Sequence, residues 1–334
     1  MEREKLKANN NAGDVLKNGY ASSRKVNYFF VALARAAGFN ATEVYVSPRS
    51  RQFFNPDAQE TGQLSADVVD VRLVSGDLYL DPACAVCPYG LLPWYETSAT
   101  GLRLDHDGGT MVTTSRSHPQ DAVVARHADL HLSSDGTLQG TLSVEYQGIR
   151  AIERRGEGWR QDEFGKEKMF TDAITRELPP GSRFKMNSIS GWDQNSRTIK
   201  VLGDVEIAGA VVPAGHRLLL TSAVLHAGEG PILQLAERTY PVYFRVPFEV
   251  SDDVVLHFPP GFHVNSLPNS VKIPAGAANY ELNVHPEGDV LRLTRDLSIS
   301  GFLFALKDYP ALRGFYAKAH QNDGQQIILA SAKP

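Results

Sequence analysis

The stretch from residue 16 to residue 38 reads LKNGYASSRKVNYFFVALARAAG and decides the fold of the first part of the chain. Ser22 or Ser23 can cap a helix here, and Gly38 offers the left-handed exit that often ends one. Apolar residues recur between them at helical spacing, and we expect them to form one buried face: Val26, Phe29, Phe30 and Leu33. The sequence therefore predicts a helix that packs on a sheet.

Strand patterns follow this helix. They predict strands over 42–46, 66–74 and 78–80, with a Ser-Gly-Asp turn at residues 75–77 between the last two. A helix followed by several short strands is typical of an α+β domain. We therefore expect residues 1–118 to form one such domain.

Alternating apolar and polar residues predominate from about residue 121 onward. They predict a hairpin over 128–132 and 141–146, and further strands over 198–207, 217–220 and 327–329. Two helical stretches interrupt this pattern, a charged one over 149–178 and a late one over 309–320. This pattern of alternating strands with two helical interruptions predicts β-sandwich-type domains with a few surface helices.

Length and composition limit the kinds of protein that this chain can be. A chain of 334 residues suits two or three domains, because single cores seldom exceed roughly 250 to 300 residues. The 42% hydrophobic and 22% charged residues are typical of folded domains. A net charge of −4, with scattered basic residues, gives no field that attracts a phosphate backbone. We expect no nucleic-acid partner.

Several segments resemble the bacterial transglutaminase-like superfamily. The matching stretches are KNGY at 17–20, VALARAAG at 31–38, YLDP at 79–82, PYGLLPW at 88–94 and YPALRGFY at 309–316. The resemblance implies a degenerate, papain-like transglutaminase core over 1–118 that lacks its usual upstream domain. A β-rich domain with inserted helices would follow over 119–236, and a C-terminal β-sandwich-like domain with a late helix over 237–334.

Chemistry in this superfamily is implied to run through a Cys, His and Asp triad. The matching positions in this chain are Ser23, Asp67 and Asp81. A hydroxyl is much harder to ionise than a thiol, and a carboxylate is a weak base at neutral pH. His106 is the first histidine in the chain, so no imidazole precedes it. The resemblance therefore predicts a pseudoenzyme with a degenerate triad.

The two cysteines of the chain form a Cys84-Ala85-Val86-Cys87 motif. Such a pair can be a redox couple, half of a zinc site or a small-ring disulfide, and it can also be two ordinary loop cysteines. Pro88 and the loop residues that follow argue against the helix that a redox pair needs. We expect plain buried or loop cysteines, with a disulfide as the second candidate and a metal or redox role as the weakest.

Histidines and aromatic residues offer further candidates. His127 and His131 would lie on one face of a strand at an interval that can suit a metal, but a solvated strand face is the commoner outcome. We therefore expect neither a metal nor a cofactor. Trp94 and Tyr95 are candidate binding residues, because amphipathic aromatic side chains often form contact surfaces.

The expected function is that of an inactive binding or scaffold module with a protein or peptide partner. The alternatives are a hydrolase or peptidase with a rebuilt Ser23, Asp67 and Asp81 site, and a thiol protein that uses Cys84 and Cys87. A missing upstream domain or a second chain could complete the core. The chain as written shows neither a signal peptide nor an apolar run of ~20 residues, whereas the resemblance implies the periplasm or cell envelope.

Overall fold

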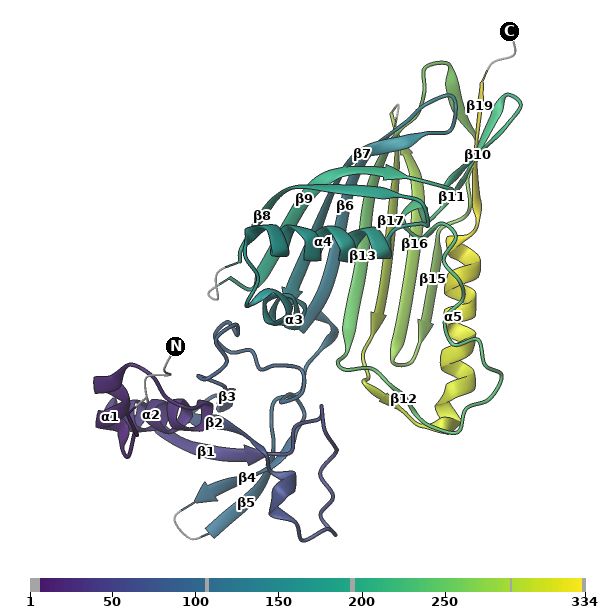
Figure 1. The fold of residues 1–334 in the computed structure, drawn as a ribbon. Helices are drawn as coiled ribbons and strands as arrows, with labels where there is room; N and C mark the ends of the chain where they lie inside the picture. Colours follow the sequence, from purple (N-terminus) through teal and green to yellow (C-terminus); the bar gives the residue numbers. More distant parts are fainter. Residues whose placement is uncertain (1–6, 106–107, 193–195, 289, 332–334) are drawn as a thin grey trace. The chain divides into compact units, whose positions relative to one another are not determined.

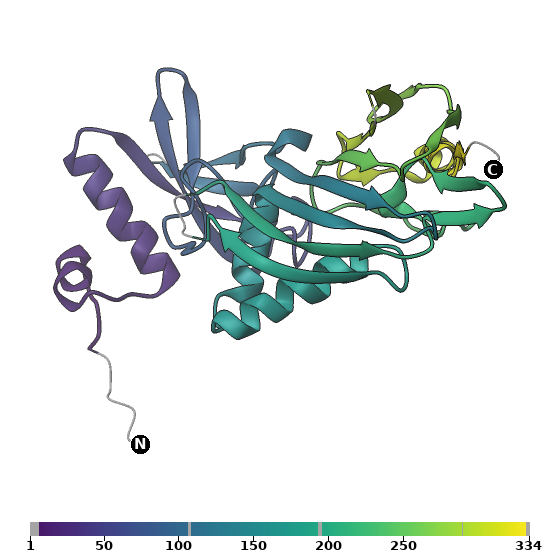
Figure 2. The same ribbon diagram turned by 90° about the horizontal axis from the view of Figure 1, so that it is seen from above.

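The computed structural model describes residues 7–105, 108–192, 196–288 and 290–331. The chain is a strand-rich α/β protein with several sheets, and it divides into two compact units whose boundary follows Ser117. Figures 1 and 2 show the elements of both units from two directions. The prediction of a mixed, strand-rich fold is confirmed at this level. His106 lies outside the described residues.

The first unit is a five-stranded antiparallel sheet with two helices. Its strand order is β3-β2-β1-β4-β5. The helices are α1 (Ala12–Asn18) and α2 (Ser23–Ala36), with a short 3-10 turn η1 (Thr61–Gln63). The strands are β1 (Asn40–Val46), β2 (Ala66–Leu73), β3 (Gly76–Leu80), β4 (Thr100–Asp105) and β5 (Gly108–Thr113). The predicted helix and its first three strands are therefore present.

The buried face of α2 agrees only in part with the one that the apolar spacing predicted. Asn27 and Val31 are its buried residues, whereas Leu33 is 51% exposed. Val31 packs in a cluster with Ala41, Val69, Val71 and Leu80 of the sheet. Of the residues predicted to be buried, Val26, Phe29 and Phe30 are half-buried, and Phe30 packs against the same cluster. Asn27 can be buried on this helix because it finds hydrogen-bond partners beneath it.

The second unit is built on an eight-stranded sheet. Its order is β15-β16-β17-β13-β6-β7-β9-β8, and β13 runs parallel to β6. The strands are β6 (Ala122–Leu132), β7 (Leu138–Gly148), β8 (Arg183–Ser190), β9 (Thr198–Ile207), β13 (Phe248–His257), β15 (Val271–Ala275), β16 (Ala278–Glu287) and β17 (Val290–Ile299). This one sheet contains neighbouring strands from both 119–236 and 237–334. The resemblance predicted a separate domain for each of these ranges.

Smaller elements complete this unit. A four-stranded sheet has the order β10-β11-β19-β14, with β10 (Val211–Ala214), β11 (Arg217–Thr221), β14 (Phe262–Ser266) and β19 (Gln326–Ser331). A two-stranded sheet joins β12 (Val242–Tyr243) and β18 (Leu303–Phe304). The helices are α3 (Ile149–Gly158), α4 (Glu163–Glu177) and α5 (Tyr309–Asp323), with 3-10 turns η2 (Pro119–Asp121), η3 (Val224–His226) and η4 (Leu306–Asp308).

One face of the eight-stranded sheet is covered and the other is open. Figure 1 shows α3, α4 and α5 on the covered side. Phe170 of α4 and Leu329 of β19 belong to the same buried cluster as Leu130 and Leu142 of the sheet, and Phe315 of α5 packs in a second cluster. On the open face, alternate residues of β6 are exposed. In the described part of the chain, no helix combines the length and apolar character of a membrane span.

Candidate functional site

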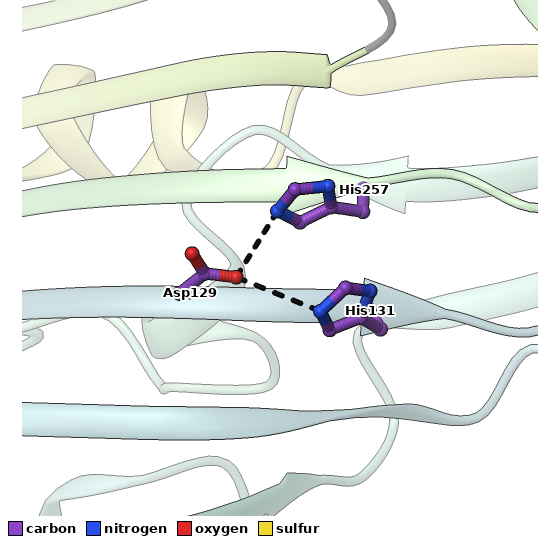
Figure 3. Close-up of side chains that lie close together, drawn as sticks. All are labelled: Asp129, His131 and His257. Carbon is purple, nitrogen blue, oxygen red and sulfur yellow. Dashed lines mark ion pairs between the residues drawn. The ribbon is translucent and has the colours of Figure 1, made fainter.

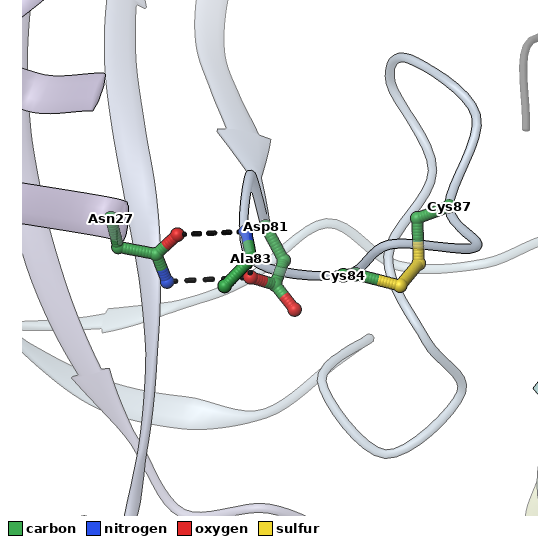
Figure 4. The surroundings of a disulfide bond; sticks show 5 residues. All are labelled: Asn27, Asp81, Ala83, Cys84 and Cys87. Carbon is green, nitrogen blue, oxygen red and sulfur yellow. Dashed lines mark hydrogen bonds between the residues drawn. A yellow bond between two sulfur atoms is a disulfide. The ribbon is translucent and has the colours of Figure 1, made fainter. Parts of the chain in front are cut away.

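Asn27 joins three parts of the first unit. Its side-chain amide nitrogen donates to the main-chain oxygen of Asp67 at 2.9 Å, to Asp67 Oδ2 at 3.0 Å and to Asp81 Oδ1 at 3.3 Å. Its amide oxygen accepts a hydrogen bond from the Ala83 N–H at 3.1 Å, as Figure 4 shows. Asp67 belongs to β2, and Asp81 directly follows β3. One helix side chain thereby holds the two strands together.

The predicted triad positions are brought together only in part. Asp67 and Asp81 meet at the Asn27 amide. Ser23 begins α2 one turn earlier and is exposed, and within the described residues its hydroxyl hydrogen-bonds neither carboxylate. The next residue, Arg24, lies 3.5 Å from Asp67 Oδ1 instead.

A third acid, Glu96, completes a buried group of carboxyls. Its side chain is 4% exposed, and burial raises its pKa well above the ordinary value, with further rises from the negative charges of Asp81 and Asp67. Burial also raises the pKa of Asp81, although hydrogen bonds from Asn27 and Ala83 oppose the rise. The cluster therefore favours a protonated Glu96 beside the ionisable Asp81.

Sequence reasoning missed both Asn27 and Glu96. Asn27 lies four residues after Ser23, on the same helix face, and a lone polar residue in an otherwise apolar stretch was the only signal for it. Glu96 comes from a loop, and nothing in its sequence neighbourhood marks it as buried.

Cys84 and Cys87 form a disulfide next to this cluster (Figure 4). The expectation of two loop thiols was therefore wrong, and the small-ring disulfide, which the sequence left open, is the observed state. A tight turn brings the cysteines together, because the Cys87 N–H donates to the Cys84 carbonyl oxygen. The disulfide lines a cleft of about 310 Å³ with Phe30, Asp81 and Tyr89.

Trp94 and Tyr95 are held by contacts within the first unit. Their rings meet edge to face with centroids 5.7 Å apart. The buried Arg49 donates from Nη2 to the Trp94 carbonyl oxygen at 2.5 Å, and its guanidinium lies over the Trp94 ring. Burial, with the nearby charges of Glu96 and Asp81, raises the pKa of Tyr95 to about 12. Both rings are half-buried parts of the fold.

The second unit contains a charged cleft of about 440 Å³. Arg126 contacts Asp252 through two hydrogen bonds of 2.6 and 2.9 Å, and His226 Nε2 lies 2.8 Å from Asp252 Oδ2. Burial alone would raise the pKa of Asp252, but Arg126 and His226 hold it well below its usual range. Charged side chains line the cleft: Arg150, Glu153, Arg154, Glu157, Glu177, Glu229 and Arg245.

Comparisons with known proteins match parts of this architecture. Residues 216–329 match a family described as a domain of unknown function with a solved structure, DUF3858. A solved structure described as a "putative protease" from Parabacteroides distasonis is similar in fold, with a TM-score of 0.50 and 12% sequence identity. The similarity covers 96% of this chain and 46% of that chain, so this chain spans about half of its length. None of the curated proteins matches this chain.

Proposed function

We propose that this chain is a catalytically inactive transglutaminase-like protein that acts as a binding or scaffold module. The sequence resemblance supports the family, and the arrangement of a helix on an antiparallel sheet is compatible with it. The first unit would be the degenerate core, and the second unit would supply most of the contact surface.

The Asn27 amide is the observation that carries the proposal. An acid at the base position would have to accept the Ser23 proton, so its free oxygen would have to face that hydroxyl. Asp67 instead accepts the Asn27 amide on Oδ2, and its Oδ1 faces the guanidinium of Arg24. Both oxygens of this carboxylate are therefore engaged by groups other than the Ser23 hydroxyl.

The thiol alternative meets a separate obstacle. Only a thiolate acts as a nucleophile, and both sulfurs of the chain are joined in the Cys84–Cys87 disulfide. This bond also supports a location in an oxidising compartment such as the cell envelope, where disulfides persist.

The binding role is best placed at the charged cleft of the second unit. Arg126 and His226 line it, and their side chains are fixed by hydrogen bonds to each other and to the buried Asp252 behind them. Arginines and glutamates around it can pair with groups of either charge. We therefore propose a protein or peptide segment that carries both signs of charge as the partner.

An activity screen tests the catalytic part of the proposal. Purified full-length protein should incorporate no amine into glutamine substrates and should hydrolyse neither peptides nor esters above the blank. The matched variant is Ser23→Ala, with Glu96→Gln as a second variant for a carboxyl mechanism. Turnover that disappears in either variant would support a rebuilt hydrolase site and overturn the proposal.

A further inference from the structure

A group of metal-ligating side chains lies on the open face of the eight-stranded sheet, away from the charged cleft. Asp129 and His131 alternate on β6 and both are exposed. In the parallel pairing with β13, His257 lies directly opposite His131, and Val255 lies opposite Asp129. Side chains at directly opposite positions of neighbouring strands point to the same face of a sheet, so the two strands present these three groups together.

The distances fit shared coordination of one ion. Asp129 Oδ1 lies 3.1 Å from His257 Nε2 and 3.7 Å from His131 Nε2, and all three ligand atoms lie within 4.8 Å of one another. Figure 3 shows the near nitrogen of each ring turned toward the carboxylate. Ligands bonded tetrahedrally to zinc at its usual bond lengths are about 3.3 Å apart. Small side-chain rotations would therefore bring the three atoms to bonding distance.

We propose that Asp129, His131 and His257 bind a divalent transition-metal ion of the zinc class. Two imidazoles with one carboxylate suit zinc, cobalt and nickel, whereas magnesium and calcium prefer oxygen ligands alone. The side chains are 56%, 67% and 37% exposed respectively, so an ion can reach them from solvent. The remaining coordination position faces outward and is open to water or to a donor atom of another molecule.

The two imidazole rings lie close together and need to tilt toward each other to share an ion, because the lone pair of each nitrogen lies in the plane of its ring. They stack with centroids 4.3 Å apart and planes 13° from parallel. After such a tilt, one nitrogen of each ring and the Asp129 carboxylate can direct their lone pairs at one cation. The pairing of the strands fixes this juxtaposition, because it holds the two backbones in register.

The ion would join the two halves of the sheet. β6 comes from the first half of the second unit and β13 from its second half, and this is the parallel pair of the sheet. An ion that binds the folded chain and not the unfolded one raises the stability of the fold by mass action. Metal binding should therefore be visible as a shift of the thermal midpoint as well as by direct titration.

Calorimetric titration of the full chain, freed of metal with a chelator, tests the proposal. Zinc chloride should bind as one ion per chain, and calcium or magnesium chloride should not bind. His131→Ala, His257→Ala and Asp129→Asn should each weaken zinc binding by at least about tenfold. Saturating zinc should raise the melting temperature of the wild type by about 5 °C and leave that of the three variants almost unchanged.

His285→Ala is the matched control. His285 belongs to β16 of the same sheet, and like His257 it is exposed and pairs with an acid, Glu287, at 2.8 Å. The His285→Ala variant should bind zinc with the same affinity as the wild type. Zinc binding that survives the three ligand substitutions, that falls equally in the control, or that is absent from the wild type would overturn the proposal. Circular dichroism of each variant checks that the fold is retained.

Discussion

At the scale of single residues, the first unit is distinguished by the amide side chain of Asn27, which lies among carboxyl groups. The Asn27 amide donates hydrogen bonds to the carboxylates of Asp67 and Asp81. Burial of Glu96, together with the negative charges of Asp81 and Asp67, raises the pKa of Glu96 and keeps its carboxyl group protonated. The pKa of both Asp81 and Glu96 is raised, but within the described residues neither carboxyl group hydrogen-bonds the Ser23 hydroxyl.

Glu96→Gln should make the folded state less sensitive to alkaline pH. The raised pKa of Glu96 means that the folded chain binds this proton more tightly than the unfolded chain does. That contribution is complete below the ordinary glutamate pKa of 4.5 and is lost as the pH rises through the raised value. Urea midpoints should therefore agree for variant and wild type at about pH 4 and favour the variant increasingly up to about pH 8.

The control for this measurement is Glu167→Gln, at an exposed position of α4. The difference between its urea midpoint and that of the wild type should not grow as the pH rises. If the urea midpoints of Glu96→Gln and the wild type differ by the same amount at every pH, the result contradicts a buried, protonated Glu96.

At the scale of elements, local patterns predicted what local physics determines. The hairpin of β6 and β7, the charged helices α3 and α4, and α5 were predicted because alternation, helical propensity and turn residues act over a few neighbours. The parallel pairing of β6 with β13 was not predicted, because the paired residues are more than a hundred positions apart in the sequence. The burial of Asn27 and Glu96 escaped prediction for the same reason: their partners are distant in sequence.

The buried face of α2 can be tested with two substitutions on one helix. Val31 is 7% exposed in the core cluster, so Val31→Ala should lower the free energy of unfolding by about 1 to 3 kcal/mol. Leu33 is 51% exposed, so Leu33→Ala should change it by less than about 0.5 kcal/mol. Denaturant unfolding measures both. A larger loss for Leu33→Ala would restore the face that the apolar spacing predicted.

At the scale of the whole molecule, the two units differ in how much core they contain. The first unit holds two small clusters, and large apolar side chains on or beside its helices remain exposed: Leu16, Leu33 and Phe39. The second unit holds an extensive cluster that spans both of its main sheets. A small unit buries a smaller fraction of its surface and is less stable for it.

Fragment expression tests this difference. Residues 1–118 alone should be unfolded or aggregated, because the exposed apolar side chains of the helices need cover from outside the fragment. Residues 118–334 should be soluble and should melt cooperatively. Circular dichroism melts and size-exclusion profiles of the two fragments give the answer. A 1–118 fragment that is soluble and melts cooperatively would contradict the expectation.

The proposed function requires that Ser23 carries no activated hydroxyl, and covalent trapping tests this requirement. A fluorophosphonate probe phosphonylates serines whose proton a neighbouring base removes: the serine oxygen bonds to phosphorus and fluoride leaves. Intact-mass spectrometry of the full-length protein after incubation with the probe should show an unmodified chain, identical in behaviour to Ser23→Ala. A stoichiometric adduct that maps to Ser23 and disappears in Ser23→Ala would contradict the account.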